Sequence, residues 1–164
     1  MTAIHIRKSN ALDYPKIIQL NDNAVQHTSI MDLKRLAELD ALSNYHSVIV
    51  VDDTVAGFLL AMRESAAYVN ENFSFFASKY DRFLYIDRIV IDATYIGLKL
   101  GTLLYNDLFD YARSNDVAVL TCEYNIEPPN EPSRRFHDKY GFKEIGTQWL
   151  DGGKKRVSLQ AALI

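Results

Sequence analysis

The chain has 164 residues, of which 48% are hydrophobic, and this size and composition predict one globular domain over residues 1–164. Its 18 basic and 21 acidic side chains give a formal net charge of −3, so the composition does not favour nucleic acid as a partner. Cys122 is the only cysteine, which excludes an internal disulfide and a cysteine metal cluster, and no metal site is expected. The absence of a signal-peptide pattern and of any bilayer-spanning apolar run predicts a cytoplasmic protein without a membrane partner.

In the N-terminal half, apolar residues either alternate or recur at helical spacing. The predicted elements are a strand around residues 4–6, helices over 12–22 and 31–42, and a hairpin over 46–62 with its turn at 52–53. Residues 63–82 have no clean period and are expected to be irregular. A connection of that length is unusual in a compact domain and is often functional.

The C-terminal half alternates buried strands with helices. The predicted elements are a strand over residues 83–93, a helix from about residue 98, a strand over 117–124, a helix between Asn130 and Gly141, and strands over 141–149 and 154–163. The whole order, β α α β β β α β α β β, contains one central strand–helix–strand unit. It predicts an α/β (α+β) domain with a mixed sheet of about seven strands and helices on both faces.

The junction before the central helix carries two glycines. Gly97 and Gly101 flank Lys99, and Thr102 follows. A helix that begins here presents unpaired backbone N–H groups and the positive end of its dipole, and glycine allows a ligand to approach closely, so the stretch suits a pyrophosphate. These residues alone allow an equal alternative, in which Gly97 marks only a turn and Gly101 only a close helix–strand contact. The stretch is neither a Walker loop nor a three-glycine dinucleotide motif.

Two stretches together resemble the GNAT superfamily of acyl-CoA-dependent N-acyltransferases. Residues 96–101, Ile-Gly-Leu-Lys-Leu-Gly, resemble the family's Arg/Gln-x-x-Gly-x-Gly/Ala signature. Residues 130–142 resemble its second signature, an Asn followed by a helix that ends in Phe-Tyr and a Gly-Phe exit. The order of elements agrees over nearly the whole chain. The resemblance implies the GNAT fold and N-acetyltransferase activity, with acetyl-CoA (coenzyme A) as donor and a primary amine of a small molecule or protein as acceptor.

The resemblance also implies that backbone groups hold most of the cofactor. The implied cofactor-binding residues are Ile89, Val90, Ile91, Ile96, Gly97, Leu98, Lys99, Leu100, Gly101, Thr102, Asn130, Ser133 and Phe136. Three positions depart from the family pattern: Ile96 replaces Arg or Gln, Lys99 replaces Gly, and His137 replaces Tyr. Lys99 can supply the charge that Ile96 lacks, but because it has a Cβ, its position is expected not to need a positive φ.

Acyl transfer to an amine requires a base that takes a proton from the amine. The candidate bases are Asp87 and Glu123, since burial on an apolar strand is expected to raise the pKa of a carboxyl group. Successive strand residues face opposite sides, so Asp87 and Arg88 are not expected to neutralise each other. The alternative for either carboxylate is a structural ion pair, which for Glu123 would involve Arg88 or Lys139.

The departing thiolate needs an acid. The resemblance implies this role for His137, which stands where the family often has a tyrosine, and Tyr140 and Tyr124 are the other candidates. The alternative for His137 is a structural hydrogen bond to the backbone or to Ser133.

The acceptor site is predicted from two segments. Tyr68, Phe75 and Phe76 belong to an aromatic run that predicts, with equal weight, an acceptor pocket or lid and a homodimer interface. Gln26 and His27 lie between the two early helices, where the resemblance implies acceptor binding, although a polar loop is the simpler explanation. The three departures from the family pattern leave a second function open, a non-catalytic acyl-CoA sensor or interaction domain. A binding module for plain nucleotides is disfavoured, because it leaves the second signature unexplained.

Overall fold

The computed structural model describes residues 2–164, and its contacts divide the chain into two compact units. Unit 1 holds the residues up to Met62 together with Ile86–Tyr111, and unit 2 holds Arg63–Tyr85 and Ala112–Ile164. The seven strands follow the hydrogen-bonded order β1-β2-β3-β4-β5-β7-β6, which confirms the predicted mixed sheet. The prediction of one domain over residues 1–164 stays a prediction. Among the described residues, no helix is long and apolar enough to cross a membrane.

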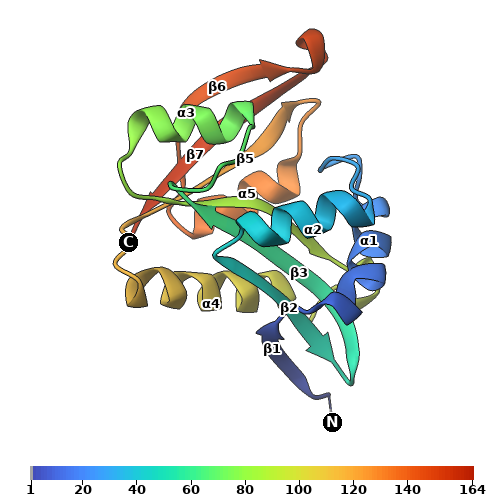
Figure 1. The fold of residues 1–164 in the computed structure, drawn as a ribbon. Coiled ribbons are helices and arrows are strands. Elements are labelled where there is room, and N and C mark those ends of the chain that lie inside the picture. The colour runs from blue at the N-terminus through green and yellow to red at the C-terminus, as the bar shows by residue number, and fades with distance from the viewer. Residues whose placement is uncertain (1) are drawn as a thin grey trace. The chain divides into compact units, whose positions relative to one another are not determined.

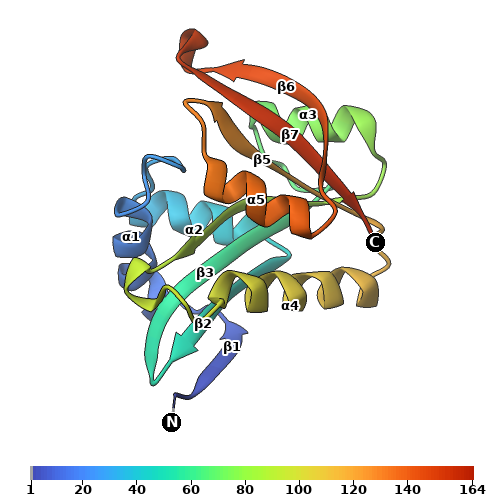
Figure 2. The ribbon, with the colours of Figure 1, turned by 180° about the vertical axis from the view of Figure 1, so that it is seen from behind.

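Unit 1 is built on an antiparallel meander. Its elements are β1 (Ile4–Lys8), α1 (Tyr14–Asp22), α2 (Leu33–Leu42), β2 (Tyr45–Val51), β3 (Thr54–Arg63), most of β4 (Leu84–Ile91) and most of α4 (Leu100–Ser114). Helices α1 and α2 lie on one face of the meander and α4 lies on the other (Figures 1 and 2). Neighbouring residues of β2 show this alternation, because the Tyr45 hydroxyl donates to Asp107 of α4 and His46 contacts Asp40 of α2, each at 2.7 Å.

The hairpin between β2 and β3 turns at the predicted residues. Asp52 and Asp53 have φ values of 46° and 69°, as a two-residue type I′ turn requires. Aspartate tolerates the left-handed region better than most residues, because its short side chain can bond locally. The side chain of Asp52 accepts a hydrogen bond from the Ala3 N–H at 2.9 Å.

Unit 2 is a second antiparallel group of strands with a helix on each face. Its elements are α3 (Glu71–Lys79), β5 (Val119–Glu127), α5 (Glu131–Lys139), β6 (Lys143–Leu150) and β7 (Lys155–Leu163), with β7 paired between β5 and β6. The first residues of β4 pair in parallel with β5, including Leu84 with Leu120. Helices α3 and α5 cover opposite faces of these strands (Figures 1 and 2).

Helix α3 lies within residues 63–82, so the prediction that this whole segment is irregular was wrong. Asn70 caps the helix, because its side chain accepts a hydrogen bond from the Phe73 N–H at 3.0 Å. Phe73 and Phe76, three residues apart, point into the core of unit 2. With nine residues, the helix shows only this one apolar repeat, which is too short for a periodicity to stand out.

Candidate functional site

The segment from the end of β4 to the start of α4 forms an exposed loop in unit 1. Asp92 opens it with a cap, accepting a hydrogen bond from the Thr94 N–H at 2.9 Å. Gly97 then takes a φ of 99°, which only glycine adopts readily, and a Cβ built there would meet no atom within 4 Å. The glycine is therefore needed for its backbone conformation rather than for close packing.

Lys99 also has a positive φ, of 56°, so the expectation that this position tolerates a side chain without strain was wrong. A left-handed conformation costs a residue with a Cβ roughly 1–2 kcal/mol. The lysine side chain is exposed, directly before the first residue of α4. The chain thus keeps a cation at the helix N-terminus despite the backbone strain.

The start of α4 has the features of an anion site. The Leu103 N–H donates to the Lys99 carbonyl oxygen at 3.2 Å, so the preceding amides of Leu100 and Gly101 lie in the turn that projects from the helix end. The fifteen-residue helix adds the positive end of its dipole. A helix N-terminus and an exposed lysine are features that suit a diphosphate, and the binding of one by this loop stays a prediction.

A buried ion pair lies on β4, so the structural alternative holds for Asp87, with a neighbour that was not expected to be its partner. The Arg88 Nε lies 2.8 Å from the Asp87 Oδ2, and the two side chains are 6% and 4% exposed. The prediction from strand alternation was wrong, because the arginine side chain is long enough to turn back to the preceding residue. Burial also favours this arrangement, since an unpaired charge in the interior is costly.

The same guanidinium fastens the connection between α1 and α2 to β4. It donates to the Ser29 carbonyl oxygen at 3.1 Å, to the Ser29 Oγ at 3.0 Å and to the Asn21 Oδ1 at 3.1 Å. The predicted acceptor residues Gln26 and His27 are exposed in this connection. Sequence reasoning missed Arg88 as an anchor, and the available signal was a charged pair within an apolar strand.

Glu123, the other candidate base, lies on β5 in unit 2. Its carboxylate accepts a hydrogen bond from the Tyr85 hydroxyl at 2.5 Å, and Tyr85 is buried. This contact is with neither Arg88 nor Lys139, the partners considered for a structural ion pair. The Tyr85 hydroxyl therefore holds the Glu123 carboxylate in a fixed orientation.

His137 has the contacts of a structural residue. It is 5% exposed, and its Nδ1 lies 2.7 Å from the Ser133 carbonyl oxygen, so this nitrogen carries a proton and donates it. Burial lowers the pKa of the imidazole, with the backbone hydrogen bond opposing that effect. Tyr140, the second candidate acid, is half-buried with its ring 5.3 Å from that of Phe136.

We expect the free energy of unfolding to fall as the pH drops from 7 to 5, and the variant His137→Phe to show a shallower fall. The unfolded state takes up a proton near 6.5, the ordinary pKa of histidine, whereas burial keeps the folded imidazole neutral. The difference between the two proteins over this interval is about 1–2 kcal/mol. Urea unfolding at several pH values measures it, and equal slopes would contradict the assignment.

The remaining residue of the second signature, Asn130, caps α5. Its side chain accepts a hydrogen bond from the Ser133 N–H at 3.3 Å, which confirms the predicted helix start. Ser133 and Phe136 follow on the same helix. On β4, Ile89 and Ile91 are half-buried, whereas Val90 is buried. Whether any of these residues touches a cofactor stays a prediction.

The aromatic residues predicted to bind the acceptor belong mainly to the core of unit 2. Phe76 is 0% exposed and Tyr68 8%, within a cluster completed by Phe73, Phe83 and Tyr85. Phe76 and Tyr68 therefore do not lie on the surface, where they could contact an acceptor. Phe75 is half-buried, and a Cβ added to Gly146 of β6 would lie 2.7 Å from its ring.

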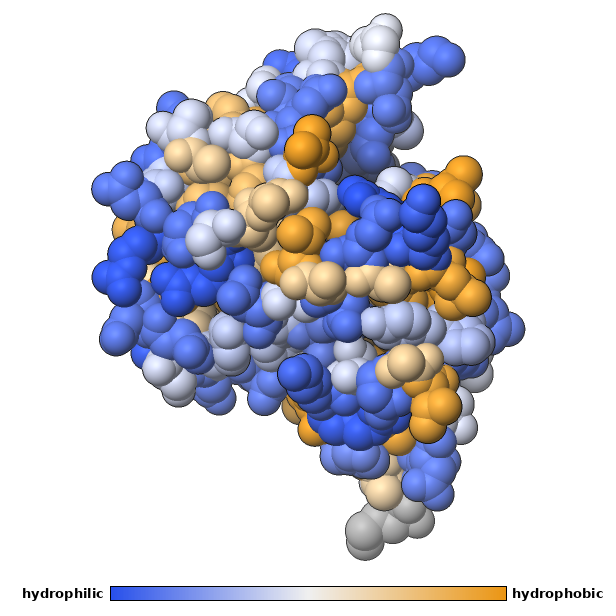
Figure 3. Space-filling model, viewed as in Figure 1, coloured by the Kyte–Doolittle hydropathy of each residue, from blue (hydrophilic) through white to orange (hydrophobic). Residues whose placement is uncertain are grey.

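On the face drawn in Figure 3, hydrophobic side chains lie among hydrophilic ones, and the homodimer stays a prediction.

Comparisons with known proteins identify the family. The family model of the Acetyltransferase (GNAT) family matches residues 13–142, which is most of the chain. The chain therefore belongs to the GNAT acetyltransferase family. A curated relative, phosphinothricin N-acetyltransferase from Streptomyces coelicolor, is 37% identical over 59 residues, which cover 36% of this chain and 33% of that protein. The match thus spans about a third of the relative's length.

Solved structures share the fold over nearly the whole chain. Ard1 from Thermoplasma volcanium superposes with a TM-score of 0.81 at 15% identity, covering 99% of this chain and 98% of that one. The structure of yncA from Salmonella typhimurium with its cofactor acetyl-CoA gives a TM-score of 0.71 at 22% identity, covering 98% and 94%. At these identities the likeness shows the fold, and the GNAT fold predicted from the two signatures is confirmed.

Proposed function

We propose that this chain is an acetyl-CoA-dependent N-acetyltransferase that acts in the cytoplasm on a primary amine of a small molecule or a protein. The observation that carries the proposal is the exposed loop at the start of α4, with Gly97 and Lys99 in left-handed conformations. Membership of the GNAT family and the acetyl-CoA in the yncA structure support the choice of cofactor.

The residues that would hold the cofactor follow from this site. In unit 1 they are the backbone groups of Ile89, Val90 and Ile91, and the segment from Ile96 to Thr102, with Lys99 adding a charge. In unit 2 the predicted contacts are Asn130, Ser133 and Phe136. When bound, acetyl-CoA supplies a thioester whose acetyl group an amine can attack directly.

The proton-transfer roles are assigned by what each side chain already contacts. We assign the base to Glu123 rather than Asp87, because Asp87 is buried in an ion pair with Arg88. Glu123 takes the proton of the acceptor amine, directly or through a water molecule. We assign the acid to Tyr140 rather than His137, since His137 donates its Nδ1 proton to Ser133 and burial favours its neutral form.

The proposal is tested by binding and turnover together. Calorimetry with coenzyme A is expected to show saturable binding, and a free-thiol assay to show acetyl transfer to at least one amine. The amine panel includes phosphinothricin, simple alkylamines and peptides with a free N-terminus. No binding at millimolar coenzyme A ends the proposal. Binding of coenzyme A without turnover of any amine favours the second function, an acyl-CoA sensor. That alternative is motivated by His137, which stands where the family often has a tyrosine.

Charge reversal at the loop separates binding from stability. We expect Lys99→Asp to weaken coenzyme A binding by about 10- to 100-fold, because it replaces a cation beside the diphosphate with an anion. The same change is expected to leave stability equal or slightly higher, since aspartate tolerates a positive φ and suits a helix N-terminus.

Two further variants control for the charge. Lys99→Asn keeps the tolerance for left-handed backbone and is expected to lose only about 3- to 10-fold in affinity. Lys34→Asp makes the same reversal of charge at an exposed position of α2 and is expected to change the affinity for coenzyme A less than twofold. Equal affinities for Lys99→Asp and Lys34→Asp would remove the loop from the binding site.

A further inference from the structure

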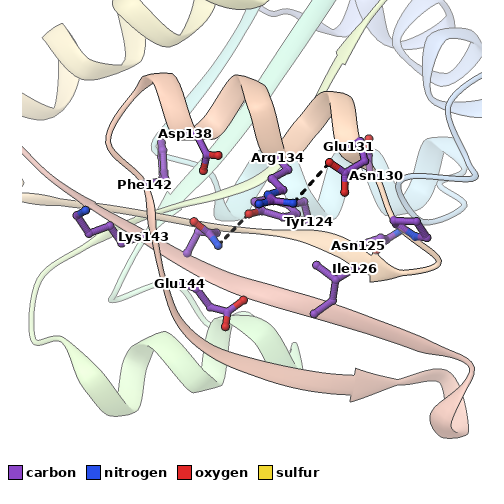
Figure 4. Close-up of a pocket in the computed structure, with 12 residues that line it drawn as sticks. Tyr124, Asn125, Ile126, Asn130, Glu131, Arg134, Asp138, Phe142, Lys143 and Glu144 are labelled. Carbon is purple, nitrogen blue, oxygen red and sulfur yellow. Dashed lines mark hydrogen bonds and ion pairs between the residues drawn. The ribbon is translucent and has the colours of Figure 1, made fainter.

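Unit 2 contains a pocket between α5 and the β6–β7 hairpin. Its volume is about 590 Å³, within the range of small-molecule sites. Figure 4 shows α5 along one side, with Arg134 and Asp138 on it, and Glu144 on the strand across. Glu131, Arg134 and Asp138, at helical spacing, line this pocket. Of the residues predicted for the cofactor and the acid, Asn130 also lines this pocket, whereas Ser133, Phe136 and Tyr140 do not.

A chain of hydrogen bonds under the pocket fixes the orientation of one buried amide. The Ser158 hydroxyl donates to a Glu144 carboxylate oxygen at 2.7 Å, so its oxygen is left to accept. It accepts from the Gln160 Nε2 at 2.6 Å, and the same Nε2 donates to the Tyr124 hydroxyl oxygen at 3.1 Å. If the Gln160 amide were flipped, its oxygen would face the Ser158 oxygen. The Ser158 hydroxyl could not donate to it, because its proton is already donated to Glu144.

The consequence is an acceptor with no donor. Gln160 is 2% exposed and lines the pocket, and its Oε1 has no hydrogen-bond partner among residues 2–164. A buried carbonyl oxygen left without a donor destabilises a protein, so such atoms in native structures are usually satisfied by water or a ligand. The pocket is many times larger than one water molecule requires.

The charges around the pocket select the sign of the ligand. Glu144 and Asp138 present carboxylates to it, whereas the Arg134 guanidinium lies 3.6 Å from the Glu131 carboxylate of its own helix. Arg134 and the exposed Lys143 line the pocket as cations, and Glu131 is a third carboxylate in the lining. Carboxylates therefore outnumber cations in the lining by three to two, and a cation with N–H groups would satisfy the Gln160 oxygen, which an anion would not.

We propose that this pocket is a binding site for a small organic cation with N–H donors, an alkylammonium or a guanidinium group. Gln160 Oε1 and the Glu144 carboxylate accept from the cation, and Asp138 adds a second negative charge. The site does not depend on the proposed acetyl transfer, since none of these three residues is assigned a part in it.

The test is a titration of the isotope-labelled full chain followed by NMR, without coenzyme A. Butylammonium and methylguanidinium are expected to bind saturably, shifting the Gln160 side-chain amide and the neighbouring amides of β7. Tetramethylammonium has the charge without an N–H donor and is expected to bind at least about tenfold more weakly. No saturable shift with either donor cation, or equal binding of tetramethylammonium, overturns the proposal.

Variants locate the site. Gln160→Met and Glu144→Gln are each expected to weaken binding by about tenfold or more, because the first removes an acceptor and the second removes the negative charge that faces the cation. Glu38→Gln makes the same change of net charge on α2 in unit 1 and is expected to alter affinity less than twofold. If Gln160→Met does not fold, the proposal is tested by Glu144→Gln together with the comparison between tetramethylammonium and the donor cations. Unchanged affinity in Glu144→Gln overturns the assignment to this pocket.

Discussion

Replacing Arg88 by methionine is expected to lower the free energy of unfolding by about 3–5 kcal/mol, a large part of the stability of an ordinary domain. Methionine fills much of the same volume but has no donors. The Asp87 carboxylate, 4% exposed, would lose its guanidinium partner at 2.8 Å. Ser29 and Asn21 would lose their hydrogen bonds to β4 as well. Urea unfolding followed by circular dichroism measures the change.

Matched variants separate this effect from the loss of any arginine. Arg35→Met breaks an exposed ion pair at 3.2 Å with Glu38 and is expected to cost less than about 1 kcal/mol. The double variant Asp87→Asn, Arg88→Met removes both charges and is expected to recover part of the loss. If Arg88→Met costs no more than Arg35→Met, the guanidinium is not the anchor described here.

Arg88→Lys tests the anchor at the connection between α1 and α2. Lysine keeps the charge near Asp87 but lacks the planar fork that reaches several acceptors at once. Amide hydrogen exchange is expected to accelerate around Ser29 more than in the strands of unit 1. Exchange that rises equally throughout unit 1 would indicate general destabilisation instead. Because Gln26 and His27 lie in this connection, a looser anchor would also raise the KM for an acceptor bound there.

The fold was predictable because its signals are local and repeated. The hairpin turn at Asp52 and Asp53, the cap at Asn130 and the stop at Gly141 each require particular residue types at one position. Such requirements leave a mark in the sequence that tertiary packing does not erase. The loop before α4 belongs to this class, since its glycines and their spacing carried the family resemblance.

The predictions that were wrong or missing concern features that depend on the three-dimensional path of the backbone and on the reach of a side chain. Strand alternation describes Cβ directions, and it did not describe Arg88, whose long side chain turns back to Asp87. Lys99 has a positive φ although lysine does not favour one, so its residue type did not indicate the conformation. The chain of hydrogen bonds that orients the Gln160 amide joins residues of three strands, so no short stretch of sequence contains it.

Replacing Glu123 by glutamine is expected to lower kcat/KM for a primary amine by about 10²–10⁴-fold, the usual contribution of a positioned general base. Glutamine keeps the length and can still accept a hydrogen bond from the Tyr85 hydroxyl, so stability is expected to change little. Calorimetry is expected to show unchanged coenzyme A affinity.

Three comparisons decide whether Glu123 is the base. Glu127→Gln removes an exposed carboxylate at the end of the same strand and is expected to keep kcat/KM within about twofold. Tyr85→Phe removes the phenol that orients Glu123 and is expected to cost less than Glu123→Gln, because the carboxylate remains. Asp87→Asn is expected to act mainly through stability, since that carboxylate is paired with Arg88. If Asp87→Asn lowers kcat/KM as far as is expected for Glu123→Gln, and Glu123→Gln does not, the two carboxylates have the opposite roles, and the base lies on β4 beside the anchor.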